Sequence, residues 1–159
     1  MGAVLGSKKC VQICVVVKDV EEKKKKWAEF LGMPVSGTSN GGPYYITKAE
    51  YKGKPEPVAN CEMGFYQLTD DISIECLQPV GGVPSEWQDF LDQHGEGLHH
   101  FAFATKHTNE LLEKVEKETG IGWTQKGNYS DGHGMYAYLD SRPQLKATIE
   151  LLESFYYDD

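Results

Sequence analysis

The alternation of hydrophobic and polar positions predicts strands and helices in a regular order along the chain. Residues 11–17 (VQICVVV) are mostly apolar and β-branched, which is typical of a buried strand. A helix is expected next, from Val20 to Leu31. Asp19 and Glu22 have the spacing of a capping box at its start, and Gly32 can end it. Three further strands are expected over residues 43–51, 58–68 and 71–78.

The same order of elements returns in the second half of the chain. A shift that places Lys106 on Lys18 also places Gly120 on Gly32, so the strand, the helix and its terminal glycine repeat together. Thr108 is expected to cap the second helix. The repeat predicts an α+β protein of two tandem βαβββ modules. The strands after the second helix are expected over residues 121–129, 133–140 and 146–154.

The two modules are expected to share one domain that covers residues 1–159. Between them, Ser85 and Gln88 form a second capping box, and Gly95 follows a short run with an apolar face, so the linker contains its own helix. The predicted boundaries are 9–79 for the N-terminal module, 80–96 for the linker and 97–154 for the C-terminal module.

Charge and composition limit the kinds of partner. The chain has 159 residues, and 24 acidic against 16 basic side chains give a net charge of -8. This balance repels phosphate backbones and anionic membranes, so neither nucleic acid nor a membrane is expected as a partner. No apolar run is long enough to span a bilayer or to act as a signal peptide, and a cytoplasmic location is expected. The four cysteines form no CxxC pair and are expected to be reduced, buried thiols.

The first strand of each module has an unusual polar residue at its start. Side chains on a strand alternate between its faces, so Gln12 shares a face with the small residue Cys14, and His100 shares a face with Ala102. The bulkier residues point the other way, toward the helix. A face with small residues and one polar side chain is typical of a strand that lines a cavity.

The last strand of each module carries a carboxylate in an otherwise apolar run. Glu75 interrupts one of these strands and Glu150 the other. A buried carboxylate without a partner is very costly, so each needs a cation, a hydrogen-bond network or a metal. The only arginine, Arg142, lies in a predicted turn and is not expected to pair with them.

If the modules pack with twofold pseudosymmetry, these four polar side chains converge. One amide oxygen, two carboxylates and one imidazole suit a divalent ion such as zinc, nickel, cobalt, manganese or magnesium. The alternative is that His100 is a core histidine and both glutamates face solvent. His99 has the opposite strand parity to His100, so no ligand role is assigned to it. Glu62 and Gln67 are the fallback ligands if Glu75 points outward.

Nearly the whole chain resembles the vicinal oxygen chelate superfamily, also called the glyoxalase and bleomycin-resistance fold. The resemblance lies in VQICVVVKDVE, GEGLHHFAF and YAYLDSRPQLKATIELLE. It implies two βαβββ modules that form a cupped mixed sheet around a metal. The family's metal positions, carried over to this chain, are Gln12, Glu75, His100 and Glu150.

Two branches of the family are similar to different parts of this sequence. GEGLHHFAF resembles the methylmalonyl-CoA epimerase branch, whereas the ligand set Gln, Glu, His, Glu is similar to glyoxalase I, or lactoylglutathione lyase. Both imply a metal-dependent isomerase or lyase that works through an enolate or enediolate, on an acyl-CoA or a glutathione adduct. The resemblance implies Glu150 as the first choice of base and Glu75 as the second, and a homodimer.

Two other branches of the family are alternatives. The antibiotic-binding branch has lost its metal and is not enzymatic, which the four retained ligand types argue against. The dioxygenase branch uses two histidines and one carboxylate to hold iron, and Gln12 in place of a histidine argues against it. Metal analysis of the protein discriminates between the enzymatic and the binding functions.

Overall fold

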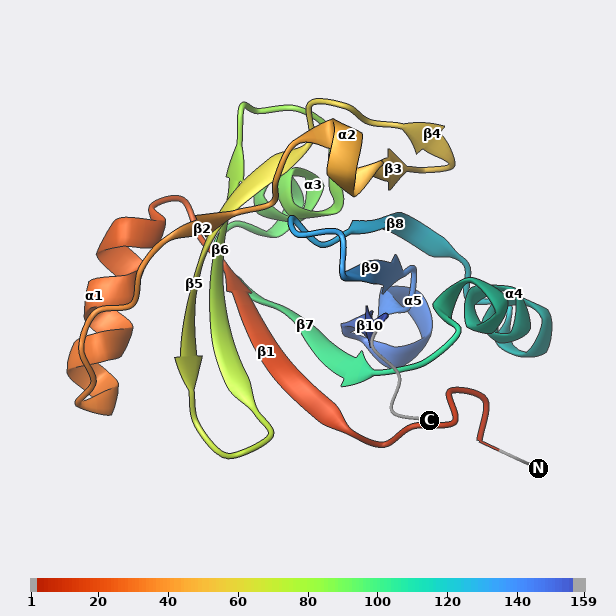
Figure 1. Ribbon diagram of the computed structural model, residues 1–159, viewed down its shortest axis with the longest axis horizontal. Coiled ribbons are helices and arrows are strands. Elements are labelled where there is room, and N and C mark those ends of the chain that lie inside the picture. Colours follow the sequence, from red (N-terminus) through yellow and green to blue (C-terminus); the bar gives the residue numbers. More distant parts are fainter. Residues whose placement is uncertain (1–2, 156–159) are drawn as a thin grey trace.

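Every strand in residues 3–155, the part of the chain that the computed structural model describes, belongs to one curled mixed sheet (Figure 1). The first strands of the two modules lie side by side and antiparallel at its centre. Each is flanked on its other side by the last strand of its own module, in parallel. The predicted α+β class and mixed sheet are confirmed. In sheet order the strands are β2 (Ser39–Asn40), β5 (Asn60–Gln67), β6 (Ser73–Val80), β1 (Cys10–Val16), β7 (Gly97–Ala104), β10 (Thr148–Ser154), β9 (Gly134–Leu139), β8 (Trp123–Asn128), β3 (Glu50–Tyr51) and β4 (Lys54–Pro55).

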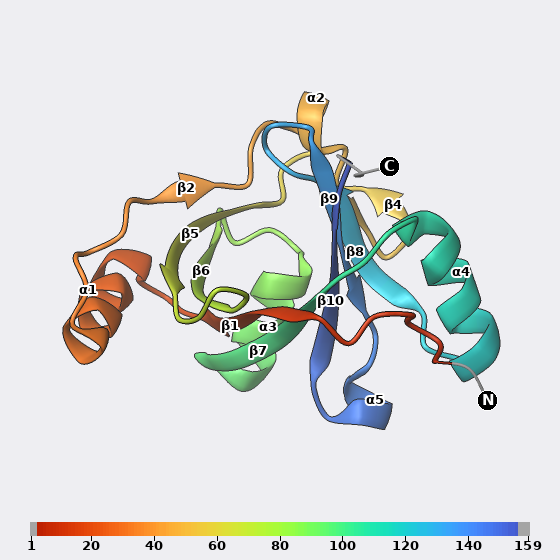
Figure 2. The same cartoon turned by 60° about the horizontal axis from the view of Figure 1, so that its bottom comes forward.

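The curl of the sheet creates a hollow between the two modules. Figure 2 shows β5 and β6 opposite β8 and β9, and residues of all four strands line a cavity between them. The helices are α1 (Val20–Leu31), α2 (Tyr44–Thr47), α3 (Glu86–His94), α4 (Thr108–Thr119) and α5 (Arg142–Leu145). Helices α1 and α4 cover the outer face, against β5 and β6 and against β10 respectively, while α3 packs on β6 and β1 from the inner face.

The expected ends of the first helix and of the linker helix are confirmed. The Asp19 side chain accepts a hydrogen bond from the backbone N–H of Glu22 at 3.1 Å, and Gly32 ends α1 in the left-handed conformation with φ of 68°. The Ser85 hydroxyl accepts from the backbone N–H of Gln88 at 3.0 Å at the start of α3. Both helices therefore begin where the capping pattern predicts.

The predicted strand over residues 43–51 is wrong. Tyr44–Thr47 form the short helix α2, and only Glu50–Tyr51 are extended, as β3. Aromatic and β-branched residues favour a strand locally, but here the backbone turns at Pro43 and again at Lys48, which has a φ of 48°. Strand β3 then pairs with β8, so a piece of the N-terminal module extends the sheet of the C-terminal module.

The predicted capping role of Thr108 is also wrong. Thr108 is the first residue of α4, and His107 before it has no side-chain capping bond. The buried carboxylate of Glu153, on β10, instead accepts hydrogen bonds from the backbone N–H groups of His107 and Thr108, at 3.1 and 2.9 Å. An acidic side chain from a distant strand therefore satisfies the positive end of this helix.

The described residues contain no helix that is long and apolar enough to cross a membrane. All four cysteines are free thiols. Cys14, Cys61 and Cys76 are buried, and Cys10 is half-buried. The expected buried thiols are thus found at three of the four positions.

Replacing Glu153 by alanine should lower the free energy of unfolding by about 2 kcal/mol, because two buried N–H groups lose a charged acceptor. Urea unfolding followed by circular dichroism measures this change. Glu113→Ala, at an exposed position in the middle of α4, is the matched control and should change stability little. Equal stability of the two variants would show that Glu153 does not cap the helix.

Candidate metal centre

One irregularity in the pairing of β1 with β7 shapes the bottom of the hollow. Cys14 pairs with His100, but Val15 pairs with Leu98, so His99 is an extra residue in β7, a β-bulge. The bulge breaks the alternation of faces: His99 Nδ1 lies 2.8 Å from His100 Nδ1, and both residues are almost fully buried, at 1% and 0% exposure. The expectation that neighbouring histidines point to opposite faces therefore fails here.

The four predicted ligand residues come together around one atom, the Nε2 nitrogen of His100. Gln12 Oε1 lies 3.0 Å from it, Glu150 Oε2 lies 2.8 Å from it, and Glu75 Oε1 lies 3.7 Å from it. These side chains come from β1, β10 and β6, the strands around the centre of the sheet. All four residues are less than 9% exposed.

Burial dominates the electrostatics of this cluster. Loss of water raises the pKa of Glu75 to about 7, with the neighbouring His100 opposing the shift and Glu150 adding to it. Burial likewise raises the pKa of Glu150 to about 8, opposed by a hydrogen bond from Tyr138. Burial lowers the pKa of His99 and of His100 to about 4, so both rings are neutral near pH 7.

The arrangement fits a divalent cation. One imidazole nitrogen carries at most one proton, yet three oxygens surround His100 Nε2. Glu150 Oε2 lies in contact with that nitrogen but, among the described residues, has no hydrogen-bond partner. A buried carboxylate oxygen without a donor is costly, and a bound cation removes the cost. Nitrogen and oxygen donors of this kind suit zinc, nickel, cobalt or manganese.

A fifth donor, Cys14, was not expected at this site. Its sulfur and one ligand atom each of Glu75 and His100 all lie within 4.8 Å of one another. Burial and the neighbouring Glu75 raise the pKa of the Cys14 thiol well above its usual value. The available signal in the sequence was strand parity, because Cys14 lies two residues after Gln12 on the same face of β1.

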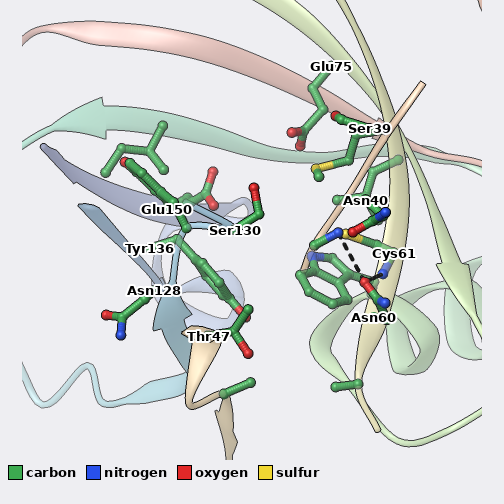
Figure 3. A pocket seen from close by; sticks show the side chains of 18 of the residues that line it. Ser39, Asn40, Thr47, Asn60, Cys61, Glu75, Asn128, Ser130, Tyr136 and Glu150 are labelled. Carbon is green, nitrogen blue, oxygen red and sulfur yellow. Dashed lines mark hydrogen bonds between the residues drawn. The ribbon is translucent and has the colours of Figure 1, made fainter. Parts of the chain in front are cut away.

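The cluster lies at the end of a cavity of about 310 Å³ between the two modules (Figure 3). Figure 3 shows Glu75 and Glu150 reaching the cavity from strands of different modules. These are its only charged lining residues in the described part of the chain, and no lysine, arginine or histidine lines it. The walls are otherwise mostly apolar or aromatic, and include Met63, Leu77, Trp87, Tyr136, Tyr138 and Leu152.

The roof of the cavity is fixed at several points. This roof is formed by Thr47 of α2 together with Asn128 and Ser130 of the opposite module, which all line the cavity (Figure 3). The side-chain amide of Asn128 donates to the backbone oxygen of Ile46 at 3.0 Å. On the other side, the backbone N–H of Gly41 donates to the carbonyl of Cys61 at 3.1 Å. Residues 41–47, which include α2, are thus bonded to both walls, through Gly41 to one and through Ile46 to the other.

The fallback ligands do not line the cavity. On β5 the cavity is lined by Cys61, Met63 and Phe65 and, at the start of the strand, by Asn60. Glu62 lies between Cys61 and Met63, points to the opposite face of the strand and does not line the cavity. Gln67 is exposed at the end of β5, where its amide donates to backbone oxygens of the following turn. Because Glu75 points inward, neither residue is needed.

Comparison with known proteins gives a family match and a group of structural neighbours. The model of the glyoxalase/bleomycin resistance protein/dioxygenase superfamily matches residues 11–139. A search of curated proteins gives no match. Among solved structures, the methylmalonyl-CoA epimerase of Mycobacterium tuberculosis superposes with a TM-score of 0.68 at 13% identity, covering 97% of this chain and 93% of that one.

Two further structures have similar scores. One is a variant of Streptomyces coelicolor methylmalonyl-CoA epimerase in complex with 2-nitronate-propionyl-CoA. It has a TM-score of 0.66 at 18% identity, covering 93% of this chain and 98% of that one. The other is a hypothetical protein from Bacillus halodurans, with a TM-score of 0.65 at 20% identity, covering 95% and 97%. At these identities the neighbours establish the fold.

The metal-free protein should become less stable as the pH rises from about 6.5 to 8, a window that starts at the pKa of unfolded histidines, above which their opposing contribution fades. In the folded state Glu75 and Glu150 hold their protons up to a pKa of about 7 and about 8. The unfolded chain has already released them, so stability falls as these groups ionise. The expected loss, measured by urea unfolding, is at least about 1.4 kcal/mol, the equivalent of one pKa unit.

The double variant Glu75→Gln, Glu150→Gln isolates this effect. It should lack the decline over the same pH range, because neither amide ionises. One equivalent of a divalent ion should also remove the decline in the native protein, because the cation stabilises the ionised carboxylates. A decline of equal size in the double variant would assign it to other groups.

Proposed function

Because the chain belongs to the glyoxalase/bleomycin resistance protein/dioxygenase superfamily, we propose that it is a metal-dependent isomerase or lyase that acts through an enolate or enediolate. One observation carries this proposal. Three oxygens from three strands converge on His100 Nε2 at the buried end of a cavity. A core histidine with outward-facing glutamates, the alternative, does not account for two buried carboxylates there.

Gln12, Glu75, His100 and Glu150 are the residues that would hold the metal. When bound, a divalent ion acts as a Lewis acid that polarises substrate oxygens and makes the adjacent C–H bond more acidic. Gln12 and His100 are uncharged, so only the two glutamates supply negative charge to the centre. The Cys14 thiol adjoins Glu75 and His100 and would make the site more attractive to zinc or cobalt than to magnesium.

Glu150 and Glu75 are the groups that would move the proton. A base must reach the proton in a plausible pose, and both carboxylates line the cavity where the substrate would lie. They enter from different modules, so a substrate between them can lose a proton to one and regain it from the other. Glu150 is the first choice, because its Oε2 has no hydrogen-bond partner within the described residues. The apolar walls exclude water that would compete for the proton.

The charge of the site favours a substrate that is neutral at its reacting end. The two carboxylates together balance one divalent ion, and no cationic side chain lines the cavity in the described part of the chain. The hydroxyl and carbonyl of a hemithioacetal, as formed by glutathione and a ketoaldehyde, add no charge. The carboxylate of a malonyl group adds an uncompensated negative charge, which is costly in a buried site. We therefore place the glutathione adduct first.

An acyl-CoA is the second candidate, on the strength of the structural neighbours. Several of them are methylmalonyl-CoA epimerases, including one in complex with methylmalonyl-CoA. The cavity has room for the reacting part of either substrate, and the carrier would extend out of its mouth. The homodimer that the family resemblance implies stays a prediction.

Purified protein should contain one divalent ion per chain. His100→Ala should lower its occupancy at least tenfold, because the only imidazole donor of the site is lost. Elemental analysis by mass spectrometry after dialysis measures this. His94→Ala, at an exposed position at the end of α3, is the matched control. Absence of a stoichiometric ion from the native protein would instead favour the non-enzymatic binding function.

Replacing Glu150 by glutamine should lower the rate of C–H exchange at least about 100-fold, the lower end of what a general base contributes. Proton NMR in heavy water follows exchange in the methylglyoxal–glutathione hemithioacetal and in methylmalonyl-CoA, and the first should exchange faster in the native protein. Glu62→Gln, on the opposite face of β5, should keep the native rate. An unchanged rate in Glu150→Gln would exclude Glu150 as the base.

A further inference from the structure

A chain of hydrogen bonds runs through Thr124, Glu86 and His99 to Nδ1 of His100, the ring nitrogen that points away from the cluster. The Thr124 hydroxyl donates to Glu86 Oε2 at 2.8 Å, and the other oxygen of Glu86 lies 3.2 Å from His99 Nε2. His99 Nδ1 in turn lies 2.8 Å from His100 Nδ1. Thr124, Glu86 and His99 do not line the cavity, and the ligand set alone gives none of these three residues a role.

The chemistry of these groups fixes which atom holds each proton. The Glu86 carboxylate can only accept, so the hydrogen between it and His99 is on His99 Nε2. A neutral His99 ring then has a bare Nδ1, which must accept from His100 Nδ1–H. His100 Nε2 is consequently left without a proton, facing the three oxygens of the cluster. The reverse order would set a bare His99 nitrogen against the carboxylate.

The surroundings of His99 keep its ring neutral. The ring is buried between Phe90 and Tyr138, with centroid distances of 4.9 and 5.6 Å. On its own backbone, the His99 carbonyl accepts from the guanidinium of Arg142 at 2.8 Å. That cation lies over the face of Phe90, 4.7 Å from the ring centre. A positive charge on His99 would be repelled by the Arg142 guanidinium. Among the described residues, only one carboxylate, that of Glu86, is bonded to the His99 ring and could offset this repulsion.

We propose that Glu86 and His99 are positioning residues that hold His100 in the tautomer with a free Nε2 lone pair, ready to bind a cation. The inference rests on the proposed metal centre and extends it to residues outside the ligand set. It also gives the linker a role. Glu86 is the first residue of α3, and its backbone N–H donates to the buried Gln125 on β8 at 2.9 Å. The linker helix is thereby anchored where its first side chain reaches His99.

Nitrogen-15 NMR of the metal-free protein tests the proposal without any activity. Long-range proton–nitrogen spectra distinguish the two tautomers of each histidine. In the native protein His100 should carry its proton on Nδ1, and in Glu86→Gln, where the amide can also donate, a fraction with the proton on Nε2 should appear. A native His100 with its proton on Nε2 would overturn the proposal.

Metal affinity gives the second readout. Glu86→Gln and His99→Phe should each weaken the binding of cobalt(II) about 10- to 100-fold, as expected when a partner of a ligand is removed. His94→Phe is the control, because His94 also packs on the Phe90 ring, at 5.1 Å, but is not part of that chain of hydrogen bonds. Native affinity in both test variants would overturn the positioning role and leave the metal centre intact. No binding by the native protein would instead refute the proposed function.

Discussion

Two carboxylates and an imidazole share a space from which water is largely excluded, and the rest of the molecule is arranged to hold them there. Left alone, this arrangement opposes folding, because each buried carboxylate either gives up its charge or bears a large desolvation cost. Strands from both modules must supply enough stability to offset it. The site therefore exists only as a property of the complete sheet, since one module supplies Gln12, Cys14 and Glu75 and the other supplies His100 and Glu150.

The duplicated topology explains how the donors meet. Each module contributes its first and last strands to the centre of the sheet, and the two first strands pair with each other, so equivalent positions face a common hollow. The linker helix closes that hollow from the inner side with Trp87 and Phe90, which pack against Tyr138 and Cys14 in one apolar cluster. Trp87 also donates to the Tyr138 hydroxyl at 2.8 Å, so the packing next to Glu150 is directional as well as apolar.

The repeated order of elements was enough to predict the fold class. Strand parity and the cost of buried charge singled out Gln12, Glu75, His100 and Glu150, and the assumption of twofold pseudosymmetry brought them together. These signals are local, and they survive because each strand keeps its period over the residues concerned. The burial of His99 was not predictable in this way. It depends on a bulge, and a bulge is a property of two paired strands rather than of one. The cap that Glu153 provides was not predictable either, because it joins a helix to a strand far along the chain. Helix α2 was missed because turns at both of its ends override the strand propensity of its residues.

The anchored roof has a consequence for how the cavity recognises a ligand. Hydrogen bonds join the segment above the cavity to both modules, so swinging it aside would break several backbone and amide interactions at once. Because this segment is already ordered, it loses little conformational freedom when a ligand binds. The entropy of association is therefore less unfavourable than it would be for a flexible loop. Selectivity between ligands then depends on the preformed shape of the cavity. A ligand that does not match this shape is not accommodated by an induced fit of the protein.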